Sequence, residues 1–302
     1  FTNSTVSAIR FTCTRSLGPL PARQGDRATS YPFLPASTSK DRAIVSQAFD
    51  DALTMIVKGI AHSKGSKGTA DSKVSKGDYP QSSSDVDDEE LIASRIFRGG
   101  EYRDLSSIDP IMAEELIAAG ALFKEPAAGS LAHDALGGDL DWPEHRGLFR
   151  NSDRDRTLLI WVNESEHMRL AIEYKGCDVQ SAFRAYATCC RRLRKALKVL
   201  QHDFAQHERL GFVGFDPQHI GTGFEGSVRI RLDYADGDDV TAVAGGTSEV
   251  AVAAAAGVAA KPVAETRLSI CKEFGLKLSE TTADQSSGTW FDLTTTTCIG
   301  KG

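Results

Sequence analysis

The segment from residue 157 to residue 207 constrains the fold most, because it joins two strand patterns to one long helix pattern. Residues 157–162 form a nearly continuous apolar run, as a buried strand would, and residues 168–174 alternate like a second strand. Residues 179–207 then place apolar side chains three and four positions apart, which predicts an amphipathic helix. That stripe consists of Phe183, Tyr186, Cys190, Leu193, Leu197, Leu200 and Phe204.

Other segments add elements of both kinds. Helices are predicted over residues 39–56, 109–123 and 266–274, and strands over residues 211–215, 227–234 and 290–293. Strands joined by short loops, with helices grouped beside them, predict an α+β fold with an antiparallel sheet flanked by helices.

Two stretches lack the apolar residues that a core needs. Residues 58–90 combine lysine, glycine and serine repeats with an acidic run, so we expect a disordered insertion there. Residues 233–263 pass from an acidic start into an alanine and glycine tract, so we expect a variable low-complexity loop. The remainder of residues 1–302 is expected to form one domain. Because Phe1 is neither an initiator methionine nor part of a signal segment, we expect a piece of a longer chain.

Charge and cysteine content exclude several classes of protein. The 302 residues carry 35 lysines and arginines against 41 aspartates and glutamates, so no global attraction to nucleic acid is expected. No run approaches the roughly 18 apolar residues that a membrane span needs, so no membrane insertion is expected. The six cysteines include no CxxC pair, which predicts no metal centre and reduced packing thiols in an intracellular protein of the cytoplasm or mitochondrion.

Three motifs carry a specific resemblance. Residues 141–149 read DWPEHRGLF, residues 159–169 read LIWVNESEHMR, and residues 210–213 read LGFV. In this order and spacing they resemble the phosphagen kinases, the ATP:guanidino phosphotransferases that include arginine kinase and creatine kinase. Residues 10–17 and 100–123 extend the similarity over most of the chain. The resemblance implies the glutamine-synthetase-like catalytic domain of that family, without its small helical N-terminal domain.

The family transfers the ATP γ-phosphoryl in line to a guanidinium nitrogen, and several arginines clamp the phosphates. The resemblance implies MgATP or MgADP as cofactor, bound weakly or not at all. The remaining cationic positions near the nucleotide are Arg10, Arg15, Arg150 and Arg169. Arg10 and Arg169 have an alternative role as structural ion-pair partners. The clamp positions without arginine are Thr12, Glu225, Ser279 and Cys298.

The acceptor side of the site is altered too. The family's guanidinium-binding glutamate aligns with Ser165, and its thiolate cysteine aligns with Asp216. Glu164 and Glu166 are possible substitutes, although a solvated loop explains them as well. Asp216 precedes Pro217, so a turn former is a simpler interpretation than a general base.

These changes predict little or no phosphagen kinase activity. Glu225 reverses the sign of one phosphate contact, and at an intermediate dielectric such a swap costs on the order of several kcal/mol. We therefore expect a catalytically inactive structural or interaction module, which binds an unidentified protein partner or a second copy of itself. Two alternatives stay open. One is an active phosphotransferase for an acceptor such as arginine, with a site rebuilt around Arg150 and Arg229, and the other is a nucleotide-binding regulator without turnover.

Overall fold

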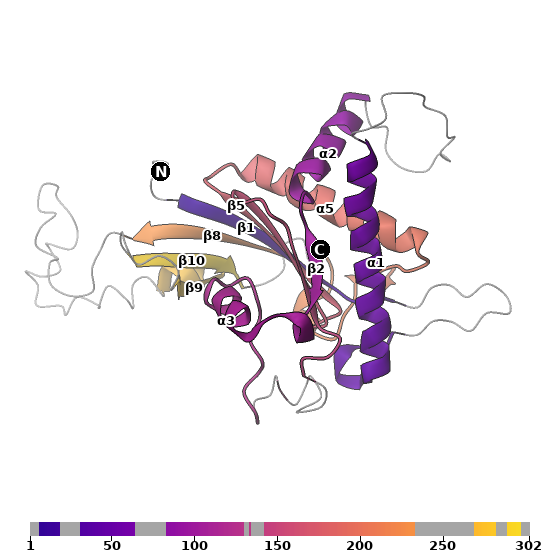
Figure 1. Ribbon diagram of the computed structural model, residues 1–302. Helices are drawn as coiled ribbons and strands as arrows, with labels where there is room; N and C mark the ends of the chain where they lie inside the picture. The colour runs from indigo at the N-terminus through magenta and orange to yellow at the C-terminus, as the bar shows by residue number, and fades with distance from the viewer. Residues whose placement is uncertain are drawn as a thin grey trace, which may run out of the picture.

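The computed structural model describes residues 6–18, 31–63, 83–129, 133, 142–232, 269–281 and 289–296. Within these residues an eight-stranded sheet runs in the order β2-β3-β4-β5-β1-β8-β10-β9, with every neighbouring pair antiparallel (Figure 1). Its strands are β1 (Val6–Arg15), β2 (Glu101–Asp104), β3 (Gly147–Arg150), β4 (Arg156–Val162), β5 (Met168–Lys175), β8 (Phe224–Leu232), β9 (Leu276–Thr281) and β10 (Thr289–Thr295). A separate ribbon pairs β6 (Gln206–His207) with β7 (Gly211–Phe212). The predicted α+β class with an antiparallel sheet is confirmed.

Helices cover both faces of this sheet unequally. Helix α5 (Val179–Val199) packs on β1 and β5 and contacts both α1 (Ser39–Ser63) and α2 (Ser83–Ile96). Helix α3 (Pro110–Ala118) lies apart from these three (Figure 1). Short 3-10 helices span Leu34–Ala36 (η1), Leu105–Ser107 (η2) and Pro217–His219 (η3). None of the described helices combines the length and apolar content that a bilayer span requires.

The main core lies between the sheet and helices α1, α2 and α5. On β1 the odd-numbered Ile9, Phe11 and Cys13 face these helices and are almost fully buried. Because side chains alternate along a strand, Arg10 and Thr12 lie on the opposite face of the sheet. Two of the predicted site positions, Arg10 and Thr12, therefore lie on that face.

Helix α5 confirms the strongest helix prediction but is shorter than expected. Asp178 caps its start by accepting a hydrogen bond from the Ser181 backbone nitrogen at 3.0 Å. The helix stops at Val199 because Gln201 takes a left-handed conformation with φ of 64°, so the predicted end at residue 207 is wrong. Phe183, which the stripe placed in the core, is 48% exposed.

The two low-complexity predictions fall largely outside the described residues. Residues 64–82 and 233–268 are not described, so the expected disorder stays a prediction for 64–82, as does the expected 233–263 loop. For residues 58–63 and 83–90 the predicted disorder is wrong, because α1 continues to Ser63 and α2 begins at Ser83. The sequence pattern placed no strand at β1 or β9, both of which the sheet contains.

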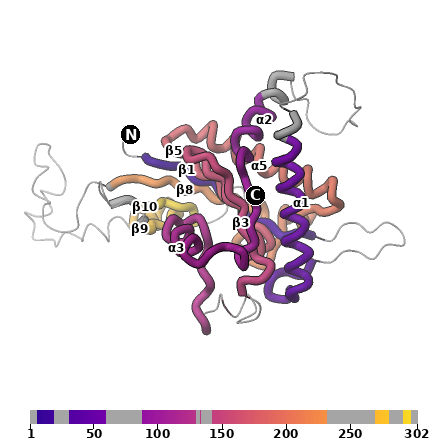
Figure 2. The backbone as a smooth tube through the Cα atoms, in the orientation of Figure 1, coloured from indigo at the N-terminus to yellow at the C-terminus, as the bar shows by residue number. Residues whose placement is uncertain are grey.

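Helix α3 covers only one part of the second face. Leu148, Leu159 and Trp161 of β3 and β4 form a small apolar cluster there with α3 side chains. Beyond this cluster, β5, β1, β8 and β10 carry ionisable side chains on the same face, and Figure 2 shows β1 running between β5 and β8. We call this region the charged face. It comprises Arg10, Arg169, Glu173, Glu225, Arg229 and Asp292.

Candidate functional site

A network of two arginines and two carboxylates lies across the charged face. Arg10 donates to the Glu173 carboxylate from Nε at 3.0 Å and from Nη2 at 2.5 Å. Arg229 donates to both oxygens of Asp292, at 2.9 and 3.2 Å, and its Nη1 lies 3.7 Å from Glu173. Glu173 therefore lies between two arginines, and a carboxylate of the same chain occupies the fork of each guanidinium.

Strand register explains why these partners meet. Arg10 on β1 lies directly opposite Glu173 on β5, and Arg229 on β8 lies directly opposite Asp292 on β10. Directly opposed residues on one face of an antiparallel sheet bring their side chains into contact. The four side chains are only 20–26% exposed, so water screens these pairs less than it would at the open surface.

A second cluster surrounds Glu225, the carboxylate at an expected arginine position. Its Oε2 accepts a hydrogen bond from Thr12 at 3.3 Å, and its Oε1 lies 3.6 Å from Nε2 of His219. The other ring nitrogen of His219 lies 3.3 Å from Asp216. The hydrogen bond with Glu225 raises the pKa of His219, and Asp216 adds to this effect against the opposing effect of burial. His219 thus lies between the carboxylates of Asp216 and Glu225.

Arg169 contributes a further cation to this cluster. Its guanidinium carbon lies 5.5 Å from the centre of the Trp161 ring, within cation–π range. The hydrogen bond from His219 lowers the pKa of Glu225, and the charge of Arg169 lowers it further. Glu225 is therefore ionised and neutralised by its own surroundings. Sequence reasoning missed His219, although its position three residues after Asp216 was a usable signal.

Arg15 does not join the charged face. It shares the helix side of β1 with Cys13, and its guanidinium carbon lies 3.9 Å from the centre of the Phe212 ring. Its Nη1 donates to the Thr14 carbonyl at 2.7 Å. Arg15 is buried and packs against the ribbon at Phe212, on the side of the sheet opposite to Arg10.

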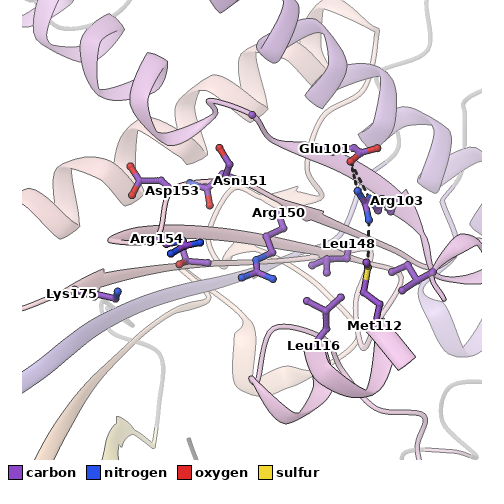
Figure 3. A pocket seen from close by; sticks show the side chains of 14 residues that line it. Glu101, Arg103, Met112, Leu116, Leu148, Arg150, Asn151, Asp153, Arg154 and Lys175 are labelled. Carbon is purple, nitrogen blue, oxygen red and sulfur yellow. Dashed lines mark hydrogen bonds and ion pairs between the residues drawn. The ribbon is translucent and has the colours of Figure 1, made fainter. Parts of the chain in front are cut away.

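Arg150 lies in a pocket of its own. Figure 3 shows its side chain between the sheet and α3, with Arg154 and Lys175 on one side and Met112 and Leu116 on the other. The pocket has a volume of about 570 Å³. Arg10, Arg15 and Arg169 do not line it, so the described structure does not gather the four predicted nucleotide-binding arginines around one site.

The acceptor side is engaged in structural contacts. Glu166 is 1% exposed and accepts hydrogen bonds from the Ser16 hydroxyl and, at 2.9 Å, from the Asp216 backbone nitrogen. The solvated-loop interpretation of Glu166 is therefore wrong. Ser165 donates to Glu164 at 2.7 Å. Asp216 caps the 3-10 helix Pro217–His219 by accepting from the Gln218 nitrogen at 2.8 Å, as a turn former does.

The remaining predicted positions add no phosphate ligand. Ser279 lies exposed on the edge strand β9 and donates to the Asp292 carbonyl at 3.4 Å, and Cys298 lies outside the described residues. Trp161 is buried and donates to the Ala121 carbonyl at 2.9 Å, so it packs as a core aromatic. Over the part of the chain that is described, no three His, Cys, Asp or Glu side chains are placed to hold a metal ion.

Comparison with known protein families gives a match over about half of the chain. Residues 89–243 match the family model described as ATP:guanido phosphotransferase, C-terminal catalytic domain. Lombricine kinase of Eisenia fetida is 33% identical over 133 residues, which are 44% of this chain and 35% of that protein. Creatine kinase M-type of Canis lupus familiaris is 33% identical over 135 residues, which are 45% of this chain and 34% of that protein. The match thus spans about a third of the length of these curated relatives.

Solved structures extend the similarity to the fold of the whole chain. A crystal structure of lombricine kinase superposes with a TM-score of 0.62 at 20% identity, covering 100% of this chain and 62% of that one. The duplicated taurocyamine kinase of Schistosoma mansoni, with bound transition state analog components, gives a TM-score of 0.61 at 20% identity, covering 99% of this chain and 31% of that one. At this identity the likeness establishes the architecture alone.

Proposed function

Since the chain belongs to the ATP:guanido phosphotransferase family through its C-terminal catalytic domain, we propose that it keeps that scaffold as a catalytically inactive structural or interaction module. The observation that supports this is the internal neutralisation of the charged face. Arg10 and Arg229 are bound to carboxylates of the same chain, and Glu225 is held between His219 and Arg169.

Phosphoryl transfer depends on cations that are available to the substrate. The protein aligns two substrates and stabilises the charge on the transferred group, with little covalent work of its own. A guanidinium that donates from Nε and one Nη to a carboxylate has one of its two bidentate edges occupied and its charge compensated, so it attracts a phosphate less. A triphosphate at the charged face would compete with Glu173 for Arg10 and would lie on the same face as the negative charge of Glu225.

The acceptor side supports the same proposal. Among the candidate carboxylates, Glu166 is buried in hydrogen bonds, and Asp216 is occupied by the η3 cap and by His219. A guanidinium acceptor would therefore find its two nearest potential ligands already used. Retention of the core with loss of the site is what a module without turnover requires, because the fold depends on packing and the activity depends on the site.

A phosphotransfer assay tests the proposal directly. ADP release from MgATP is followed with arginine, creatine, lombricine or taurocyamine as acceptor, on protein that unfolds cooperatively. We expect no turnover above background. A turnover above about 1 s⁻¹, the low end for kinases, would contradict the proposal if Arg169→Ala abolished it. Activity that Arg169→Ala left unchanged would identify a contaminant.

Calorimetry separates the module from a nucleotide-binding regulator. We expect a dissociation constant for MgADP weaker than about 1 mM, which is a binding free energy of about −4 kcal/mol. Tighter binding of MgADP without turnover would contradict the inactive module and favour a nucleotide-binding regulator.

A further inference from the structure

Two thiols meet between the sheet and its longest covering helix. The sulfur of Cys13 on β1 lies 3.7 Å from the sulfur of Cys190 on α5. Cys13 is 1% exposed, whereas Cys190 is only partly buried. Both belong to regular elements packed in the main core, so the fold itself sets their separation. A disulfide has a sulfur–sulfur bond of about 2 Å, so small side-chain rotations would bring the pair together.

The surroundings of Cys13 favour its thiolate form. The hydrogen bond from Cys190 lowers the pKa of Cys13 to about 6 against the opposing effect of burial, and the charge of Arg15 and a hydrogen bond from Tyr186 add to the lowering. The adjacent Cys189 differs, because burial raises the pKa of its thiol. The thiolate is the nucleophilic form of cysteine, so Cys13 is the reactive partner.

A groove of about 1070 Å³ lies beside this pair. Arg15 and Tyr186, which both interact with the Cys13 thiol, line it together with Phe183 and Phe224, whereas the two cysteines themselves do not line it. Phe183 is 48% exposed, so the groove is open to solvent on that side. Hydrogen peroxide is not much larger than water, so it is the oxidant that a largely buried pair beside this groove favours.

We propose that Cys13 and Cys190 form an oxidative modification site, at which hydrogen peroxide generates an intrachain disulfide. The Cys13 thiolate attacks one peroxide oxygen, the O–O bond breaks, and the departing hydroxide takes a proton to become water. The Cys190 sulfur then displaces the hydroxyl from the resulting sulfenic acid, and this group leaves as a second water with the thiol proton. In total, two thiols and one peroxide give one disulfide and two waters.

The bond would join positions 177 residues apart and tie α5 to β1. A cross-link across so long a loop removes conformational freedom from the unfolded chain. The oxidised protein should therefore unfold at a higher temperature than the reduced protein. This inference does not depend on the proposed loss of phosphoryl transfer, because neither thiol lies on the charged face.

Peptide mapping tests the site. The reduced full chain is treated with hydrogen peroxide, its free thiols are alkylated, and it is digested with trypsin without reduction. The expected product links the peptide FTCTR (11–15) to AYATCCR (185–191), and its mass is the sum of the two peptides less two hydrogens, plus the one alkyl group on Cys189. Free thiols should fall from six to four, and dithiothreitol should reverse both the cross-link and a rise of several degrees in melting temperature.

Serine variants identify the partner, because the second peptide contains two cysteines. Cys190→Ser should abolish the cross-link, and Cys189→Ser should leave it intact. If Cys13→Ser failed to fold, the comparison of these two variants would still decide the assignment. Loss of the cross-link in Cys189→Ser alone, oxidation confined to the exposed Cys177, or retention of all six thiols would overturn the proposal.

Discussion

Glu173→Gln is the sharpest test of internal neutralisation. Glu173 accepts two hydrogen bonds from Arg10 and lies 3.7 Å from Arg229, so the substitution removes one negative charge shared by two guanidinium groups. We expect the charged face to gain affinity for a polyanion. Inorganic pyrophosphate is a suitable probe because it presents phosphate oxygens without an acceptor or a base.

The magnitude follows from Coulomb's law. A phosphate bound to the freed forks would lie about 5 Å from the former carboxylate, and an effective dielectric of about 20–40 gives roughly 2–3 kcal/mol of repulsion removed. Affinity should then rise by about 30-fold or more, since each 1.4 kcal/mol is tenfold. Losing the charged hydrogen bonds should cost about 1–2 kcal/mol of folding free energy, a modest amount for pairs that are a quarter exposed.

Calorimetric titration with pyrophosphate and urea unfolding measure the two effects. Glu90→Gln is the matched control, because it also removes one carboxylate partner of an arginine, at the Arg192 pair between α2 and α5. The reasoning is refuted if Glu173→Gln folds and binds pyrophosphate no more tightly than Glu90→Gln. In that case, something other than the neutralisation of Arg10 and Arg229 by Glu173 limits anion binding at the charged face.

Three further predictions concern stability. Glu225 raises the pKa of His219 above its ordinary 6.5. The stability that protonated His219 contributes is therefore present below about pH 6.5 and is lost as pH rises through the raised pKa. The unfolding free energies of wild type and His219→Gln in urea should converge toward alkaline pH. Burial lowers the pKa of His167 to about 4. The unfolding free energy of the wild type should therefore fall by roughly 3 kcal/mol between pH 6.5 and pH 4. The unfolding free energy of His167→Gln should fall much less over the same range. Leu170→Ala empties a fully buried position on β5 and should cost about 2–5 kcal/mol in the same unfolding assay, whereas a loss below 1 kcal/mol would contradict the assigned core.

Local patterns in the sequence determined much of the architecture. The short apolar run at β4 and the alternation at β5 are typical of strands, and the spacing of three and four in α5 is typical of a helix. The motifs then placed these elements in a known family. The pattern still missed β1 in the middle of the sheet as well as β9 at its edge.

The chemical state of the site was decided by the tertiary structure. The sequence indicated that Glu225 and Asp216 stand where an arginine and a cysteine were expected, but it did not reveal His219 between them. Nor did it show that Arg10 meets Glu173, 163 residues away. A cross-strand pair depends on which strands are neighbours and in which register, and both are set by the packing of the whole sheet. Local periodicity carries no information about such partners, so only the folded chain shows which cations are free and which are already bound.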